Sequence, residues 1–113
     1  MERWLINGVP GETISLDDRG LHYGDGLFET IAVRQGVCRF LDAHLERLAE
    51  GCVRLKIPVP DDGCLRSELQ QLTKATLHAT LKIIITRGSN PPGSLLPDCC
   101  GPTRILGIQQ TQL

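Results

Sequence analysis

The sequence lacks the features that would point to several common classes of partner. Its 113 residues carry 12 basic and 13 acidic side chains, so the net charge of -1 favours neither nucleic acid nor an anionic membrane surface. It has no apolar run near the roughly 20 residues that cross a bilayer, and its N-terminus lacks the apolar stretch of a secretory signal. We therefore expect a cytoplasmic protein with one domain over residues 1–113 and no nucleic-acid or membrane partner.

Cysteine is present, but without a disulfide or metal-binding pattern. The five cysteines show no C-x-x-C spacing and include an adjacent pair whose mutual bridge would be strained: Cys38, Cys52, Cys64, Cys99 and Cys100. The three histidines do not pair with them at a zinc-finger spacing. We interpret the cysteines as reduced thiols and predict no metal site.

Turn signals and β-branched residues predict two hairpins in the first half of the chain. Asn7-Gly8 interrupts an apolar run, and Asn-Gly is a strong signal for a type I′ turn. Residues 28–34 and 37–41 are strand-like and meet at Gln35-Gly36. We expect four strands in this half.

The period then changes to that of a helix. Apolar residues recur at steps of four and three from Leu41 to Leu55, which predicts a helix with Asp42 as its N-cap and Pro58 as its stop. A second helix is expected over residues 62–78, followed by a buried strand at 81–86, a proline-rich loop at 88–102 and a last strand at 103–111. The order β-β-β-β-α-α-β-β predicts an α+β two-layer sandwich, with two helices on one face of a largely antiparallel sheet.

Three stretches are candidates for a functional site, each with a purely structural alternative. In "YGDGLFET" the glycines allow positive φ and close approach, although the segment alone is better explained by a strand turn. On the first helix, Arg47 shares a face with Gly51, whose mid-helix position costs about 1 kcal/mol and suggests that something packs closely there. An arginine fork on this face could bind phosphate, whereas the alternative is a solvated face. Arg87, at the end of the 81–86 strand, is either a substrate contact or an ordinary edge charge.

In combination, the stretches "DRG", "YGDGLFET", "HLERL" and "TRGS" resemble the class IV pyridoxal-phosphate enzymes. This family includes D-amino-acid and branched-chain aminotransferases and aminodeoxychorismate lyases, and the chain is most similar to the lyases. The resemblance covers the family's N-terminal domain. It implies a lyase that forms 4-aminobenzoate and pyruvate for folate biosynthesis, or alternatively an aminotransferase, in either case a homodimer that acts on a small molecule with the cofactor as electron sink.

The resemblance also implies roles for individual residues. Arg47 matches the arginine that binds the cofactor phosphate, while Phe28, Tyr23 and Arg87 match positions near the substrate. Pro92 and Ser94 stand where D-amino-acid transaminases carry an arginine and a histidine that bind the substrate carboxylate, so the residues for that role are left open.

The family's cofactor-binding lysine belongs to a second domain. Lys56, Lys74 and Lys82 do not match its position, so we expect this chain to lack the catalytic lysine, to be inactive alone and not to retain pyridoxal phosphate by itself. The remaining hypothesis, from another functional class, is a non-catalytic interaction domain with the same fold.

Overall fold

The computed structural model describes residues 2–89 and 101–111. The elements follow in the order β1 (Glu2–Ile6), β2 (Val9–Pro10), α1 (Arg19–Tyr23), β3 (Gly26–Arg34), β4 (Val37–Cys38), α2 (Leu41–Leu55), α3 (Asp62–Thr73), β5 (Ala79–Thr86) and β6 (Thr103–Gln110). The strands form one antiparallel sheet in the order β2-β1-β6-β5-β3-β4.

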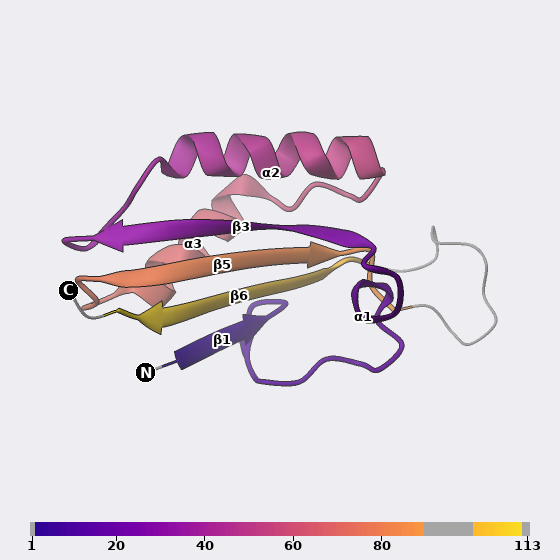
Figure 1. Cartoon of the computed structure of the whole chain (residues 1–113), viewed down its shortest axis with the longest axis horizontal. Coiled ribbons are helices and arrows are strands. Elements are labelled where there is room, and N and C mark those ends of the chain that lie inside the picture. The colour runs from indigo at the N-terminus through magenta and orange to yellow at the C-terminus, as the bar shows by residue number, and fades with distance from the viewer. Residues whose placement is uncertain (1, 90–100, 112–113) are drawn as a thin grey trace.

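The two long helices lie on the same face of this sheet, α2 over β3 and α3 towards β6 (Figure 1). Neither long helix covers the opposite face, where the short helix α1 lies against Thr86 at the end of β5 (Figure 1). The α+β two-layer prediction is confirmed. We call the two sides of the sheet the helix face and the open face.

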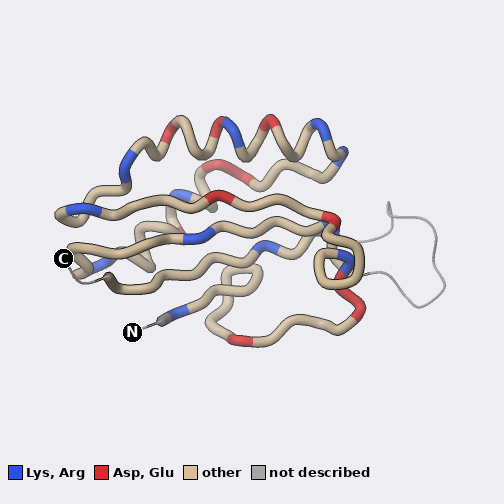
Figure 2. Tube along the Cα trace, viewed as in Figure 1, with Lys and Arg blue, Asp and Glu red and all other residues tan. Residues whose placement is uncertain are grey.

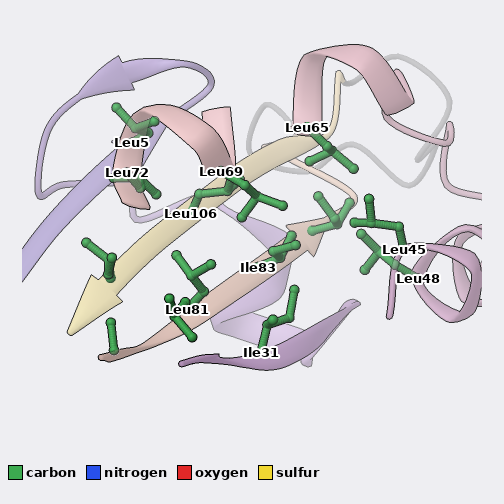
Figure 3. Packing of buried hydrophobic residues seen from close by; sticks show 14 of the residues in the cluster. Leu5, Ile31, Leu45, Leu48, Leu65, Leu69, Leu72, Leu81, Ile83 and Leu106 are labelled. Carbon is green, nitrogen blue, oxygen red and sulfur yellow. The ribbon is translucent and has the colours of Figure 1, made fainter. Parts of the chain in front are cut away.

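The core lies between the sheet and the helices. Alternate residues of β3 and β5 point to the helix face, as the period of two requires, and Ile31, Leu81 and Ile83 are completely buried there. Leu45 and Leu48 of α2 and three leucines of α3 cover them from the other side (Figure 3). Burial of each such side chain contributes roughly 1.5–3 kcal/mol to folding.

Both predicted hairpin turns have the backbone conformation that a type I′ turn needs. Asn7 and Gly8 have φ of 51° and 83°, and Gln35 and Gly36 have φ of 53° and 76°. Positive φ at both central residues matches the twist of the flanking strands. These turns set the pairing of β1 with β2 and of β3 with β4.

The structure corrects several predicted element boundaries. A short helix, α1, precedes β3 where only a turn was expected; Asp18 caps its start and Gly24, at φ 61°, ends it. The helix α2 has Phe40 at its N-cap and not Asp42, and it ends at Leu55 because Lys56 adopts the left-handed conformation. The helix α3 ends at Thr73, five residues before the predicted end.

Other predictions concern cysteines and the proline-rich loop. Cys38, Cys52 and Cys64 are free thiols, whereas Cys99, Cys100, Pro92 and Ser94 lie outside the described residues. Where the chain is described, it contains no group of three or more His, Cys, Asp and Glu side chains able to hold a metal ion. None of the helices α1 to α3 is long and apolar enough to span a membrane.

Candidate functional site

A cluster of three charged or polar side chains connects α2 to β3 on the helix face. Glu29 of β3 is only 6% exposed, and its Oε2 accepts a hydrogen bond from Arg47 Nε at 2.9 Å. Its Oε1 accepts from Arg47 Nη2 at 2.7 Å and lies 2.7 Å from His44 Nδ1. Because His44 and Arg47 are three positions apart on α2, both reach the same strand. The two-pronged contact fixes the orientation of the guanidinium.

The charges of this cluster stabilise one another. Burial alone would raise the pKa of Glu29, but the hydrogen bonds from Arg47 and His44 outweigh burial and lower that pKa below its ordinary value. The hydrogen bond to Glu29 raises the pKa of Arg47. Since an ionised carboxylate only accepts hydrogen bonds, the proton between His44 and Glu29 is assigned to Nδ1 of the histidine.

One end of Arg47 remains open to solvent. Its side chain is 70% exposed, while that of Glu29 is 7% exposed, and Nη1 donates to no acceptor in the described part of the chain. The buried carboxylate therefore holds one edge of the guanidinium and leaves other donors available. A planar, permanently charged group presented in this way suits a phosphate.

Gly51 lies one turn beyond Arg47, and the structure identifies what approaches it. A Cβ atom at Gly51 would lie 2.4 Å from Cδ1 of Leu27, so the strand side chain occupies the space that an alanine would need. The predicted close approach at this glycine is confirmed. The contact brings α2 near enough to β3 for Arg47 to reach Glu29.

The edge of β3 that faces away from β5 is largely unpaired. Among the described strands only β4 pairs with it, through Val33 and Arg34, and the Ala32 carbonyl accepts from Arg39 N–H at 2.8 Å. Residues 26–31 therefore have no strand partner on this side in the part of the chain that the structure describes. Proteins usually cover such an edge. This unpaired edge includes Glu29, and it separates the helix face of the sheet from the open face.

The predicted wall of the site lies at the beginning of β3. Phe28 follows Leu27 and precedes Glu29, so it points to the open face and is 60% exposed. It lines a depression of about 420 Å³ together with residues of α1 and the ends of β5 and β6. Tyr23 is 71% exposed at the end of α1, with the Arg19 guanidinium 4.6 Å from its ring centre. The structure brings Phe28 and Arg47 to opposite sides of one strand.

Arg87 has an internal role that the sequence did not reveal. Its Nε donates to Asp25 at 2.8 Å, and its two terminal nitrogens donate to the carbonyls of Leu55 at 2.6 Å and Lys56 at 3.1 Å. Asp25 also accepts from Arg19 at 2.8 Å. Arg87 therefore ties the end of β5 to the C-terminus of α2, and its direct contact with substrate stays a prediction.

Charged residues of both signs occur along α2 and at the end of the sheet beside α1 (Figure 2). Glu29, within β3, was not among the residues predicted from the sequence to form the site. Its signal was available: β3 places Leu27, Ile31 and Val33 on the buried side, and Glu29 occupies the same alternation. A carboxylate among core positions needs a cationic partner.

Comparison with known proteins identifies relatives for nearly the whole chain. The family described as "Amino-transferase class IV" matches residues 26–112. An aminodeoxychorismate lyase from Vibrio harveyi is 38% identical over 91 residues, which are 78% of this chain and 32% of that protein. A bifunctional aminodeoxychorismate lyase / D-amino acid transaminase from Mycobacterium tuberculosis is 29% identical over 94% of this chain and 39% of its own length.

A solved structure agrees with these relatives. The 4-amino-4-deoxychorismate lyase from Pseudomonas aeruginosa superposes with a TM-score of 0.84 at 44% identity, over 96% of this chain and 40% of that one. The chain thus spans well under half the length of each of these three proteins.

Proposed function

Since this chain belongs to the amino-transferase class IV family, we propose that it is the N-terminal part of a pyridoxal-phosphate-dependent aminodeoxychorismate lyase. Such an enzyme converts 4-amino-4-deoxychorismate to 4-aminobenzoate and pyruvate, a reaction of folate biosynthesis. The observation that carries the proposal is the exposed guanidinium of Arg47, held by buried Glu29 at the unpaired edge of β3.

The residues of this cluster fit the phosphate of the cofactor. Arg47 has a fixed direction, a permanent charge and donors that no described residue uses. Glu29 directs Arg47 and takes no proton at neutral pH, because its pKa is lowered. His44 holds the second side of the same carboxylate. Arg47 would thus bind the phosphate, while Glu29 and His44 would orient it.

The cofactor, Phe28 and the catalytic lysine would have separate roles in the rest of the site. When bound, pyridoxal phosphate supplies an electron sink for bond cleavage next to the substrate amine. Phe28 on the open face limits the space for substrate and excludes water. We propose that the catalytic lysine comes from a part of the enzyme outside these 113 residues, which is why the chain alone is expected neither to turn over substrate nor to retain the cofactor.

An aminotransferase of the same family is the second candidate. It is supported by the bifunctional mycobacterial relative, whose name combines both activities. The lyase is preferred because identity to the two lyases is 38% and 44%, against 29% for the bifunctional enzyme. Homodimerisation and a cytoplasmic location belong to this proposal as well.

The cofactor role of Arg47 is tested with the enzyme that carries this chain. We expect Arg47→Ala to weaken pyridoxal-phosphate binding by at least tenfold, measured by cofactor absorbance after dialysis, because a charge-assisted bidentate contact contributes about 1.5–3 kcal/mol. Arg54→Ala is the matched control, since Arg54 is exposed on the same helix. Equal cofactor affinity in both variants would remove Arg47 from this role.

The reaction is tested by product analysis. The lyase releases pyruvate and 4-aminobenzoate from 4-amino-4-deoxychorismate without an added 2-oxo acid. Transfer of the amino group to an added 2-oxo acid, without pyruvate release, would establish the aminotransferase instead. A separate experiment with the 113-residue chain uses borohydride reduction after incubation with pyridoxal phosphate. A stoichiometric adduct on one of its lysines would contradict the expected location of the catalytic lysine.

A further inference from the structure

The open face of the sheet carries one lysine in a central strand, Lys82 of β5. In the register of the sheet it pairs with Thr30 of β3 on one side and with Gly107 of β6 on the other. Trp4 of β1 pairs with Gly107, and its ring lies where a Cβ of that residue would be, at 2.3 Å. Thr30, Lys82 and Trp4 therefore form a row across the open face.

This row borders a concavity that is separate from the Arg47 cluster. The cavity of about 260 Å³ is lined by Trp4, Thr30, Thr80, Lys82, Gly107, Ile108 and Gln109. Its lining combines a cation, two hydroxyls and an amide with the indole ring. Arg47 and Glu29 lie on the opposite side of the sheet, because successive residues of β3 point to opposite faces.

Lys82 has an aromatic neighbour, and it forms no ion pair in the part of the chain that the structure describes. Its Nζ lies 4.7 Å from the ring centre of Phe28, a cation–π distance. No carboxylate of residues 2–89 or 101–111 forms an ion pair with it. The ammonium is therefore held over the proposed pocket wall with its charge uncompensated by the described residues.

We propose that Lys82 binds a carboxylate of the substrate on the open face, with the Thr30 hydroxyl as a second donor. This inference rests on the proposed function and names the residue for a role that the sequence left open. The ligand class is a planar, unsaturated ring that carries a carboxylate: the ammonium and hydroxyl match its oxygens, and the rings of Phe28 and Trp4 match its apolar faces. The cofactor phosphate and this carboxylate would then flank β3 from its two faces.

The test uses the 113-residue chain and 4-aminobenzoate as the probe, with aniline as the analogue that lacks the carboxylate. NMR titration follows the Lys82 side-chain protons, the Phe28 ring and the Trp4 indole. We expect 4-aminobenzoate, and not aniline, to shift all three. Because an exposed ion pair contributes up to about 1 kcal/mol, Lys82→Met should raise the dissociation constant about fivefold.

Two further variants define the outcome. Lys82→Arg keeps the charge and should restore binding, while Lys74→Met removes an exposed lysine on the helix side and should change nothing. Equal affinity in Lys82→Met and the unsubstituted chain, a response to aniline as large as that to 4-aminobenzoate, or no response at Lys82 would overturn the inference. Inorganic phosphate is titrated into the same samples: a retained response at Arg47 would show that only the Lys82 assignment has failed.

Discussion

Replacement of Gly51 by alanine tests the packing that keeps Arg47 against β3. In an ordinary helix interior this change stabilises the fold by about 1 kcal/mol, because glycine loses more backbone freedom. Here the new Cβ would lie 2.4 Å from Leu27 Cδ1, about 1 Å closer than a van der Waals contact allows. Leu27 packs against the core, so its displacement costs about 1–3 kcal/mol. We expect a net loss of roughly 1 kcal/mol.

The assay is urea unfolding monitored by circular dichroism. Gly63→Ala, in the first turn of α3, is the matched control because its Cβ would meet only the Asp61 carboxylate, at 3.3 Å. That variant should be as stable as the unsubstituted protein or more stable. In a Leu27→Ala background the clash is gone, and Gly51→Ala should then stabilise by about 1 kcal/mol.

The double-mutant cycle distinguishes two effects of Gly51→Ala: the packing clash with Leu27 and the higher helix propensity of alanine. If Gly51→Ala stabilises the protein by the same amount whether residue 27 is leucine or alanine, then Leu27 does not need the space beside Gly51. The predicted packing contact would then be refuted. The Arg47 Nε–H resonance gives a second readout, because separation of α2 from β3 lengthens the bond to Glu29. We expect this resonance to shift in Gly51→Ala and to return in the double variant.

Two other substitutions test the charged contacts. The pKa of Glu29 is lowered on folding, so its ionised form stabilises the fold above the ordinary value of 4.5, and this contribution is lost as pH falls through the folded value. Glu29→Gln should therefore make the melting temperature less dependent on pH below that value; an unchanged acid profile would contradict the assignment. Arg87→Met should cost about 2 kcal/mol or more in urea unfolding, since it removes hydrogen bonds to Asp25 and to two carbonyls at the end of α2. A loss confined to substrate affinity, with stability unchanged, would instead support the predicted substrate contact.

The sheet and the long helices were predictable because their signals are local and repeated. Several residues of β3 and β5 alternate between buried and exposed positions, and all of them indicate a strand. The leucines of α2 in the same way all indicate a helix by their spacing. The short helix α1 has no buried residue, so no apolar period marks it, and only the Asp18 cap and Gly24 define it. The early end of α3 likewise has no clear signal in the sequence. Just after it, Ala75 adopts a φ of 61°, a conformation that alanine does not favour.

The candidate site was predictable in part. Arg47 could be chosen from its helix face and its neighbouring glycine, because both lie within one element. Its partner Glu29 is 18 residues away, and the contact depends on how α2 crosses β3. The internal bonds of Arg87 depend in the same way on two elements, since Leu55 lies 32 residues from it in the chain. Long-range polar pairs of this kind appear only once the packing is known.

The register of β3 connects the two proposed anion sites. Glu29 faces α2 and Phe28 faces Lys82, so a slip of one residue would exchange them and destroy both sites. Two features at the ends of the strand oppose such a slip. The type I′ turn at Gln35-Gly36 sets one end of the strand, and the seating of Leu27 against α2 sets the other. In the two proposals, the alternation at the beginning of β3 would therefore place Phe28 on the substrate side and the next residue, Glu29, on the cofactor side.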